Sequence, residues 1–577
     1  STCATVAIGT AEMLAGYVYL STFAVAAPVP INVNITSGTI EGSLIDGISI
    51  FRGIPYAAPP VGTNRWRTPQ PPTPWEGIRD ANEDGAGCPQ TCTLPDLACP
   101  PKQDEDCLYL NVFTGSTTGN APILFFVHGG NFFQGYGGGV LYDGTSFARE
   151  HGVVLISINY RLGALGFLYS GPETNQSVAG DDDAPLTGNY GLLDQQHALR
   201  WAQANARAFG GDPTRVALFG QSAGGASVAS HLTMPSSKGL FASAIMESMP
   251  FGLTFRTAEK YPSFTKVLAK DAGCKGKKPA EYVPCLRALP WQEVEKAQDK
   301  AASDLIVEHG QILSLFQPYA PTVGTPLLDK QPIENFMAGN VHDVPVIIGS
   351  VKDEGLLFVY EAFPKPEKAL QEDALIKLVW GHDAKAIKKA YPVPEEQKKA
   401  KDVRNHTSDI ATDALFHCAN RAAALAIADQ RASGTRSSST WLYHFDHVIS
   451  FGEAFWLPST PICVDSVCHS EELPFVFNPD VSSINVSFTP VEQNLIRAMQ
   501  SYWADFATNG RPGSGGALQV EWPTFGSTNE TAMLFRANST LESSAYRQKC
   551  AVWDELGFDW VVGQDQIASA TDLVQEL

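Results

Sequence analysis

The pentapeptide Gly220-Gln-Ser-Ala-Gly224 is the feature that most restricts how this chain can fold. It directly follows a short apolar run, 216–219, that predicts a strand, and it precedes a stretch of small residues, 225–231, that predicts a helix. A serine flanked by glycines at such a junction matches the sharp strand-to-helix turn called the nucleophile elbow. The N-terminus of the helix would present N–H groups to negative charge that develops near the serine. We therefore predict that Ser222 is a nucleophile.

Other apolar runs alternate with helical patterns along the chain, which is typical of a mostly parallel sheet. Runs that predict strands lie at 123–127, 153–158, 344–348 and 441–445, and residues 191–209 predict a helix. Continuous apolar runs indicate strands that are buried on both faces. The predicted fold class is therefore α/β, with a large, mostly parallel central sheet flanked by helices.

The overall charge restricts the partners of the chain. Its formal net charge is −20 at pH 7, and we find no basic cluster beyond the short stretch 275–278. Nucleic-acid binding requires a basic face that displaces counterions, so we predict no nucleic-acid partner. We also predict no cofactor and no metal. An acidic surface suits a protein that acts on small neutral molecules.

The N-terminus and the glycosylation sequons indicate a secreted protein. Residues 1–27 are largely apolar, although Glu12 interrupts them, and end in Ala24-Val-Ala-Ala27, so we predict a signal peptide there and a single domain over 28–577. No other stretch is long and apolar enough to span a bilayer, which predicts the absence of a membrane anchor. The Asn-X-Ser/Thr sequons are Asn34, Asn175, Asn405, Asn485, Asn529 and Asn538.

The cysteine content agrees with secretion. Of the eleven cysteines, Cys3 would leave with the signal peptide, and the ten that remain could form five disulfides. The alternative is a set of buried free thiols.

Several sequence blocks, in the right order along nearly the whole chain after the predicted signal peptide, resemble the type-B carboxylesterase family. This family includes cholinesterases and secreted fungal lipases. The blocks are Phe51-Arg-Gly-Ile-Pro-Tyr-Ala-Ala-Pro-Pro-Val-Gly62, Glu105-Asp-Cys-Leu-Tyr-Leu-Asn111, Asn159-Tyr-Arg-Leu-Gly-Ala-Leu-Gly-Phe167 and Gly188-Asn-Tyr-Gly-Leu-Leu-Asp-Gln195. The resemblance implies the α/β-hydrolase fold and the hydrolysis of a small-molecule carboxylic ester through an acyl-serine.

The resemblance also implies the partners of Ser222. A serine hydroxyl needs a general base and an acid that orients the base, and in this fold they follow the serine in the order acid, then histidine. Glu354, which precedes Gly355, matches the acid of the family, and Asp353 is the alternative from the residues alone. His469 matches the family's catalytic histidine. Its rivals are His444 and His447, which suit a structural role better.

The oxyanion hole is assigned in the same way. The N–H of Ala223 is one expected donor, and the resemblance implies Gly130 and Asn131 as the others. Asn131 departs from the family, which usually has a third glycine here. It still offers its N–H, but its side chain would narrow the space beside the substrate. We expect His128 to brace this loop and not to act in catalysis.

The resemblance implies three disulfides and one ion pair. The disulfides are Cys88–Cys107, Cys274–Cys285 and Cys418–Cys550. Two further pairs, Cys92–Cys99 and Cys463–Cys468, follow from proximity alone. The expected ion pair joins Arg65 to Glu105.

Two departures argue against a cholinesterase. Gln221 precedes the nucleophile where that subgroup has Glu, and the position of the choline-stacking Trp falls near Leu97. A triacylglycerol lipase is the alternative substrate class, but a short loop between Cys88 and Cys107 would make a poor mobile lid. A binding or adhesion protein, and a storage protein, on the same fold are the hypotheses that compete with the esterase.

Overall fold

The computed structural model describes residues 28–172, 186–309, 317–513, 520–544 and 546–558. The predicted signal peptide and the sequon Asn175 lie outside these residues. No helix among the described residues is long and apolar enough to cross a membrane.

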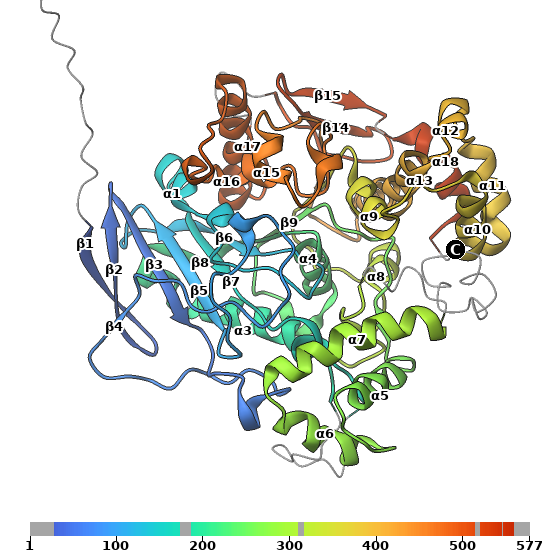
Figure 1. Ribbon diagram of the computed structural model, residues 1–577. Coiled ribbons are helices and arrows are strands. Elements are labelled where there is room, and N and C mark those ends of the chain that lie inside the picture. The colour runs from blue at the N-terminus through green and yellow to red at the C-terminus, as the bar shows by residue number, and fades with distance from the viewer. Residues whose placement is uncertain (1–27, 173–185, 310–316, 514–519, 545, 559–577) are drawn as a thin grey trace, which may run out of the picture.

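A sheet of 13 strands forms the centre of the molecule (Figure 1). Its middle is a run of parallel strands, and the predicted α/β class with a mostly parallel sheet is therefore confirmed. In spatial order these are β7 (Val154–Ile158), β6 (Ala121–Val127), β8 (Gly211–Gln221), β9 (Ser243–Glu247), β12 (Val346–Val351), β13 (Thr440–Phe445) and β14 (Thr531–Phe535).

Antiparallel strands extend the sheet at both ends. At one end β5 pairs with β7, and a meander of three strands continues outward, with the short β4 beside β2. At the other end β15 pairs with β14. The bounds are β1 (Val29–Ile35), β2 (Gly38–Ile45), β3 (Ile48–Pro55), β4 (Ile78–Asp80), β5 (Tyr109–Thr114) and β15 (Thr540–Ser543).

Helices cover both faces of the sheet, which explains the continuous apolar runs. Alternate residues of β6 point to opposite faces: Ile123 and Phe125 pack in one cluster with α3 and α4, and Leu124 and Phe126 pack in another with α17. On the first face lie α3 (Tyr190–Asn205), α4 (Ala223–Thr233), α8 (Pro332–Ala338) and α14 (Cys418–Ala432). On the second lie α1 (Thr145–His151), α16 (Leu473–Phe477) and α17 (Pro490–Asn509).

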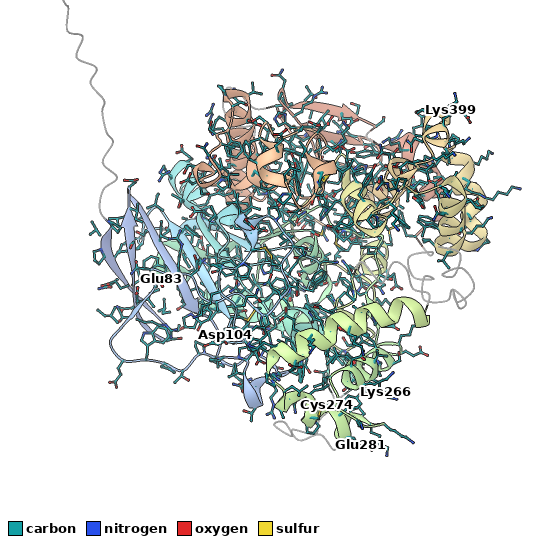
Figure 2. The ribbon with its side chains drawn as sticks, in the orientation of Figure 1. Glu83, Asp104, Lys266, Cys274, Glu281 and Lys399 are labelled. Atoms are coloured by element: carbon teal, nitrogen blue, oxygen red, sulfur yellow. A yellow bond between two sulfur atoms is a disulfide. The ribbon has the colours of Figure 1, made fainter. Side chains whose placement is uncertain are left out.

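The other helices of the described residues complete the fold. The helices of the Lys- and Glu-rich stretch 365–401 lie at the periphery, where charged side chains such as Lys399 are exposed (Figure 2). The bounds are α2 (Gly163–Phe167), α5 (Tyr261–Asp271), α6 (Pro279–Ala288), α7 (Trp291–His309), α9 (Glu354–Ala362), α10 (Ala369–Trp380), α11 (Ala384–Ala390), α12 (Glu395–Ala400), α13 (Arg404–Ala411), α15 (Gly452–Trp456) and α18 (Arg547–Leu556).

Five disulfides cross-link the described chain at the pairs expected from the sequence. The pair Cys418–Cys550 ties α14 to α18 across a sequence separation of 132 and restricts the unfolded chain most in the chain-entropy view. The others are Cys88–Cys107, Cys92–Cys99, Cys274–Cys285 and Cys463–Cys468. The asparagines of the described sequons are all exposed, at Asn34, Asn405, Asn485, Asn529 and Asn538.

The expected ion pair between Arg65 and Glu105 is present and buried. Nε and Nη2 of Arg65 lie 2.5 and 2.6 Å from the two carboxylate oxygens of Glu105. Nη1 of Arg65 donates to the carbonyl oxygens of Leu286, Arg287 and Leu289. One guanidinium therefore joins the N-terminal segment, the loop closed by Cys88 and Cys107, and the end of α6.

Replacing Arg65 by Ala should lower the free energy of unfolding by about 3–5 kcal/mol, because it leaves the Glu105 carboxylate buried without its partner. Thermal denaturation measures the effect. The matched control is Lys398→Ala, which removes an exposed pair with Glu395 and should change stability by less than about 1 kcal/mol. Equal melting temperatures for the two variants would contradict the expectation.

Candidate active site

Ser222 lies in the turn between β8 and α4, with φ 57° and ψ −120°. This is a strained conformation for a residue with a side chain. The turn is so tight that the positions two residues before and after Ser222 must be glycines: a Cβ on Gly224 would collide with the carbonyl oxygen of Val127, and one on Gly220 with the backbone of Gly224. The N–H of Ser222 donates to the carbonyl oxygen of Glu247 at 2.8 Å. The turn therefore fixes a partly exposed serine at the edge of the sheet.

Because the central strands are parallel, their C-terminal ends meet at this same edge. The loop 128–135 follows β6, Glu354 lies just after β12, and Glu247 is the last residue of β9. Segments that are far apart in the sequence thus converge around Ser222.

Glu354 and His469 form a buried hydrogen-bonded pair. Nδ1 of His469 lies 2.5 Å from Oε2 of Glu354, and the second carboxylate oxygen of Glu354 accepts from the N–H of Val351 at 2.8 Å. Glu354 is 0% exposed and His469 is 4% exposed. A carboxylate held at both oxygens fixes the orientation of the imidazole and favours a proton on Nδ1.

The loops that carry these two residues are tied together. Asp353 forms a β-bridge with Cys468, and its carboxylate accepts from the N–H of Val467 at 3.1 Å. The disulfide Cys463–Cys468 closes the segment just before His469. The structure thus places Glu354 against His469 and gives Asp353, the alternative acid, a structural contact.

Aromatic rings hold the imidazole of His469 in place. The ring centroids of Phe358 and Phe416 lie 5.0 and 5.3 Å from that of His469. Phe416 belongs to a π-helical segment, Thr412–His417, between α13 and α14. Such segments occur frequently at functional sites. The hydroxyl of Thr412 accepts from the N–H of Gly355, which ties the segment to α9.

The loop after β6 lies against the nucleophile. A Cβ on Gly129 would lie 2.9 Å from the carbonyl oxygen of Gln221 and 3.1 Å from Cβ of Ser222, so a residue larger than glycine would force the loop or the turn to shift. Gly130 and Asn131 both have positive φ, at 93° and 58°. Within the described residues, the N–H groups of Gly130, Asn131 and Ala223 make no hydrogen bond. These N–H groups are therefore available to an oxyanion.

His128 braces this loop. Its ring stacks on that of Tyr160 with centroids 4.5 Å apart, and Nδ1 lies 2.8 Å from the carbonyl oxygen of Gly129. Burial lowers the pKa of His128 to about 4, which keeps the ring neutral. The rival histidines are also engaged elsewhere: His444 lies near Glu542 and His447 near Glu492.

The contact between Ser222 and His469 differs from the expected one. Among the described residues, no hydrogen bond joins the Ser222 hydroxyl to His469. Nε2 of His469 lies instead 3.2 Å from Nε2 of Gln221, a side chain that is 2% exposed. Catalytic hydrogen bonds are often loose before substrate binds, so this geometry is compatible with a serine–histidine pair.

Two further carboxyls lie near the site, and sequence reasoning missed them. Glu247 accepts from Nε1 of Trp503 at 2.7 Å, and Glu472 accepts from the hydroxyl of Ser248 at 3.3 Å. Burial raises the pKa of Glu247 to about 8, and burial together with the charges of Glu247 and Glu354 raises that of Glu472. Glu247 ends a strand that was not predicted from the sequence, and its partner Trp503 is 256 residues away, so no local pattern indicated this residue.

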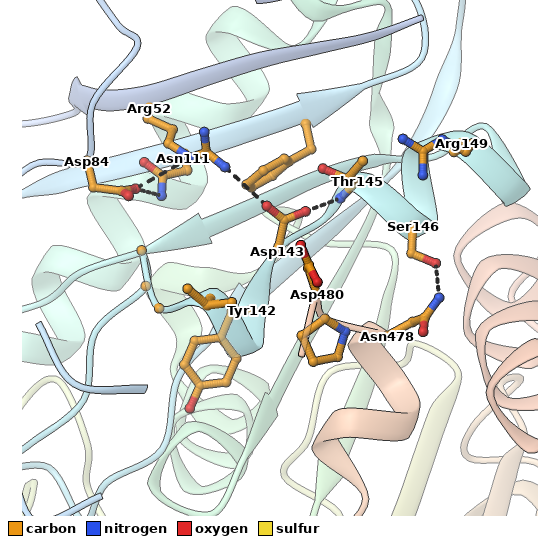
Figure 3. Close-up of a pocket in the computed structure, with 16 residues that line it drawn as sticks. Arg52, Asp84, Asn111, Tyr142, Asp143, Thr145, Ser146, Arg149, Asn478 and Asp480 are labelled. Carbon is orange, nitrogen blue, oxygen red and sulfur yellow. Dashed lines mark hydrogen bonds and ion pairs between the residues drawn. The ribbon is translucent and has the colours of Figure 1, made fainter. Parts of the chain in front are cut away.

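A cavity of about 530 Å³ lies outside this constellation (Figure 3). Among the residues that line it, Nη2 of Arg52 lies 3.1 Å from Oδ2 of Asp143, and the carboxylate of Asp84 accepts from the side-chain amide of Asn111 at 2.6 Å. Ser222, Glu354 and His469 do not line it. Its polar groups largely satisfy one another, and the candidate active site is therefore the one around Ser222.

Comparison with known proteins places this geometry in a family. The chain is 31% identical to the crystal protein of Dictyostelium discoideum, over 91% of each chain. It is 33% identical to the para-nitrobenzyl esterase of Bacillus subtilis, over 89% of this chain and 96% of the relative. A solved PNB esterase superposes with a TM-score of 0.73 at 30% identity and covers 90% of this chain and 99% of its own. The profile of the carboxylesterase family matches residues 29–553. The chain therefore belongs to the carboxylesterase family, which includes the para-nitrobenzyl esterase.

Proposed function

We propose that this protein is a secreted serine esterase that cleaves neutral carboxylic esters through an acyl-serine intermediate. Ser222 attacks the ester carbonyl, His469 accepts the serine proton, and Glu354 orients His469 and stabilises the imidazolium. The observation that carries the proposal is the buried 2.5 Å contact between His469 and Glu354 beside the strained turn of Ser222.

The oxyanion of the tetrahedral intermediate would accept hydrogen bonds from the N–H groups of Gly130, Asn131 and Ala223. Their lack of partners among the described residues and the approach of Gly129 to Ser222 support this assignment. The leaving alcohol takes the proton from His469, and a water molecule then releases the acid by the same steps in reverse.

The expected substrates are esters in solution and not lipids at an interface. The loop between Cys88 and Cys107 contains a second disulfide, Cys92–Cys99. Gln90 in this loop exchanges two hydrogen bonds with the backbone of Gly135. A loop that is cross-linked and tied to its neighbour is a poor mobile lid, which argues against a triacylglycerol lipase.

Secretion is supported by the five disulfides and by the exposed sequons. A storage or binding protein on the same fold is the second candidate, because one relative is named a crystal protein. A panel of p-nitrophenyl esters of increasing acyl length, combined with organophosphate labelling of Ser222, tests the two. If the protein showed neither ester turnover nor labelling of Ser222, the esterase would be rejected.

We expect acetylthiocholine to be hydrolysed with a lower kcat/KM than phenyl acetate. Gln221 carries no charge, and the missing aromatic stack would cost about 0.5–2 kcal/mol of cation–π binding, several-fold or more in affinity. The net charge of −20 attracts cations from a distance, but salt screens this over about 10 Å. The test is to measure kcat/KM for both esters under the same conditions. A preference for acetylthiocholine would indicate that another aromatic side chain binds the cation.

A further inference from the structure

The side-chain amide of Gln221 contacts Nε2 of His469, the nitrogen that must accept the proton of Ser222. Nδ1 of His469 faces the carboxylate of Glu354, which can only accept, so Nδ1 carries the proton and Nε2 offers a lone pair. The group that faces Nε2 at 3.2 Å must then be a donor, and the NH₂ of Gln221 is one. His469 is thus held from both ring nitrogens.

The surroundings of Gln221 restrict its side chain. Gln221 is the last residue of β8, pairs in register with Glu247 and directly precedes Ser222. A Cβ on Gly129 would lie 2.8 Å from the amide oxygen of Gln221, so the loop after β6 packs closely against this amide. The amide is therefore clamped between that loop and the imidazole.

We propose that Gln221 is a positioning residue for ester hydrolysis: its NH₂ group holds His469 in the neutral form with the proton on Nδ1, and releases Nε2 to Ser222 when an ester binds. The inference rests on the proposed role of His469 as the base. A donor to the lone pair of Nε2 favours the uncharged imidazole, which is the form that can accept a proton. An amide does this without adding a charge beside Glu354.

A carboxylate in the same place would have the opposite effect. Glu at position 221 could only accept, and together with Glu354 it would favour an imidazolium between two negative charges. Three other carboxyls near the site, Glu247, Glu361 and Glu472, would stay unchanged. Burial raises the pKa of Glu361, and the nearby His469 opposes this rise.

The test is the pH dependence of kcat/KM for p-nitrophenyl acetate in the full chain and in two variants. Activity requires neutral His469, so kcat/KM falls as the pH drops through the pKa of the base. In Gln221→Glu we expect the acidic limb to move to higher pH by at least about one unit. In Gln221→Met, which only removes the donor, we expect a rise on the order of half a unit.

The matched control is Gln196→Glu, which is 3% exposed and whose NH₂ contacts the hydroxyls of Ser236 and Ser237. Its acidic limb should stay where it is in the unchanged protein. If Gln221→Glu does not fold, the shift of the acidic limb in Gln221→Met tests the proposal alone. Lower activity at every pH without a shift, or unchanged profiles, would overturn the inference. Absence of any ester hydrolysis in the unchanged protein would instead reject the proposed function.

Discussion

Replacing Ser222 by Ala should lower kcat for ester hydrolysis on the order of 10⁶-fold, while the protein remains folded. The change removes one oxygen atom and with it the acyl-enzyme route, so that only binding and the oxyanion donors remain to accelerate the attack of water. The fold should persist because Ser222 is held by its backbone, through the hydrogen bond from its N–H to Glu247, and alanine keeps that N–H.

Ser230→Ala is the matched control. Ser230 lies in α4, the helix that begins just after Ser222, is fully buried, and donates its hydroxyl to the carbonyl oxygen of Ala226. It should keep activity within a few-fold. Turnover and labelling by an organophosphate should both be lost in Ser222→Ala and both be kept in Ser230→Ala. Full activity in Ser222→Ala would end the assignment of the nucleophile.

The parallel centre of the fold could be predicted because its strands are buried on both faces. The apolar runs at 123–127 and 441–445 correspond to β6 and β13, and the predicted helix 191–209 corresponds to α3 with a short 3₁₀ turn after it. The outer strands β1 and β2 were not predicted, because they are only partly buried and carry polar residues. Burial on one side leaves a weaker pattern in the sequence.

Of the candidate site, only the residues that lie in recognisable sequence motifs could be predicted. The glycines around Ser222 mark a turn that few other residues can adopt, and blocks similar to a family indicated Glu354 and His469. The contact of Gln221 with His469 depends on the approach of Gly129, and the buried Glu247 depends on Trp503, which is 256 residues away. Such side-chain contacts are set by the packing of distant segments, and no local pattern encodes them.

Replacing Glu354 by Gln should lower kcat about 10³–10⁴-fold, although the side chain keeps its shape. The carboxylate accepts a proton from Nδ1 of His469, whereas the NH₂ group of a glutamine in that place would donate to it. The imidazole would then carry its proton on Nε2, where it cannot accept one from Ser222. The oxygen that accepts from the N–H of Val351 would be retained, so the loop should stay in place.

Asp353→Asn is the control that separates the two acids. Asp353 lies one residue earlier, and its carboxylate accepts from the N–H of Val467. An amide oxygen can still accept there, so this variant should keep activity within about tenfold and lose at most some stability. The measurement is kcat for p-nitrophenyl acetate in both variants, with circular dichroism to establish folding. If Asp353→Asn lost more activity than Glu354→Gln, Asp353 would be the orienting acid and the 2.5 Å contact of Glu354 with His469 would be structural. The buried position of Glu354, with both oxygens engaged by the base and by the end of β12, is the reason to expect the reverse.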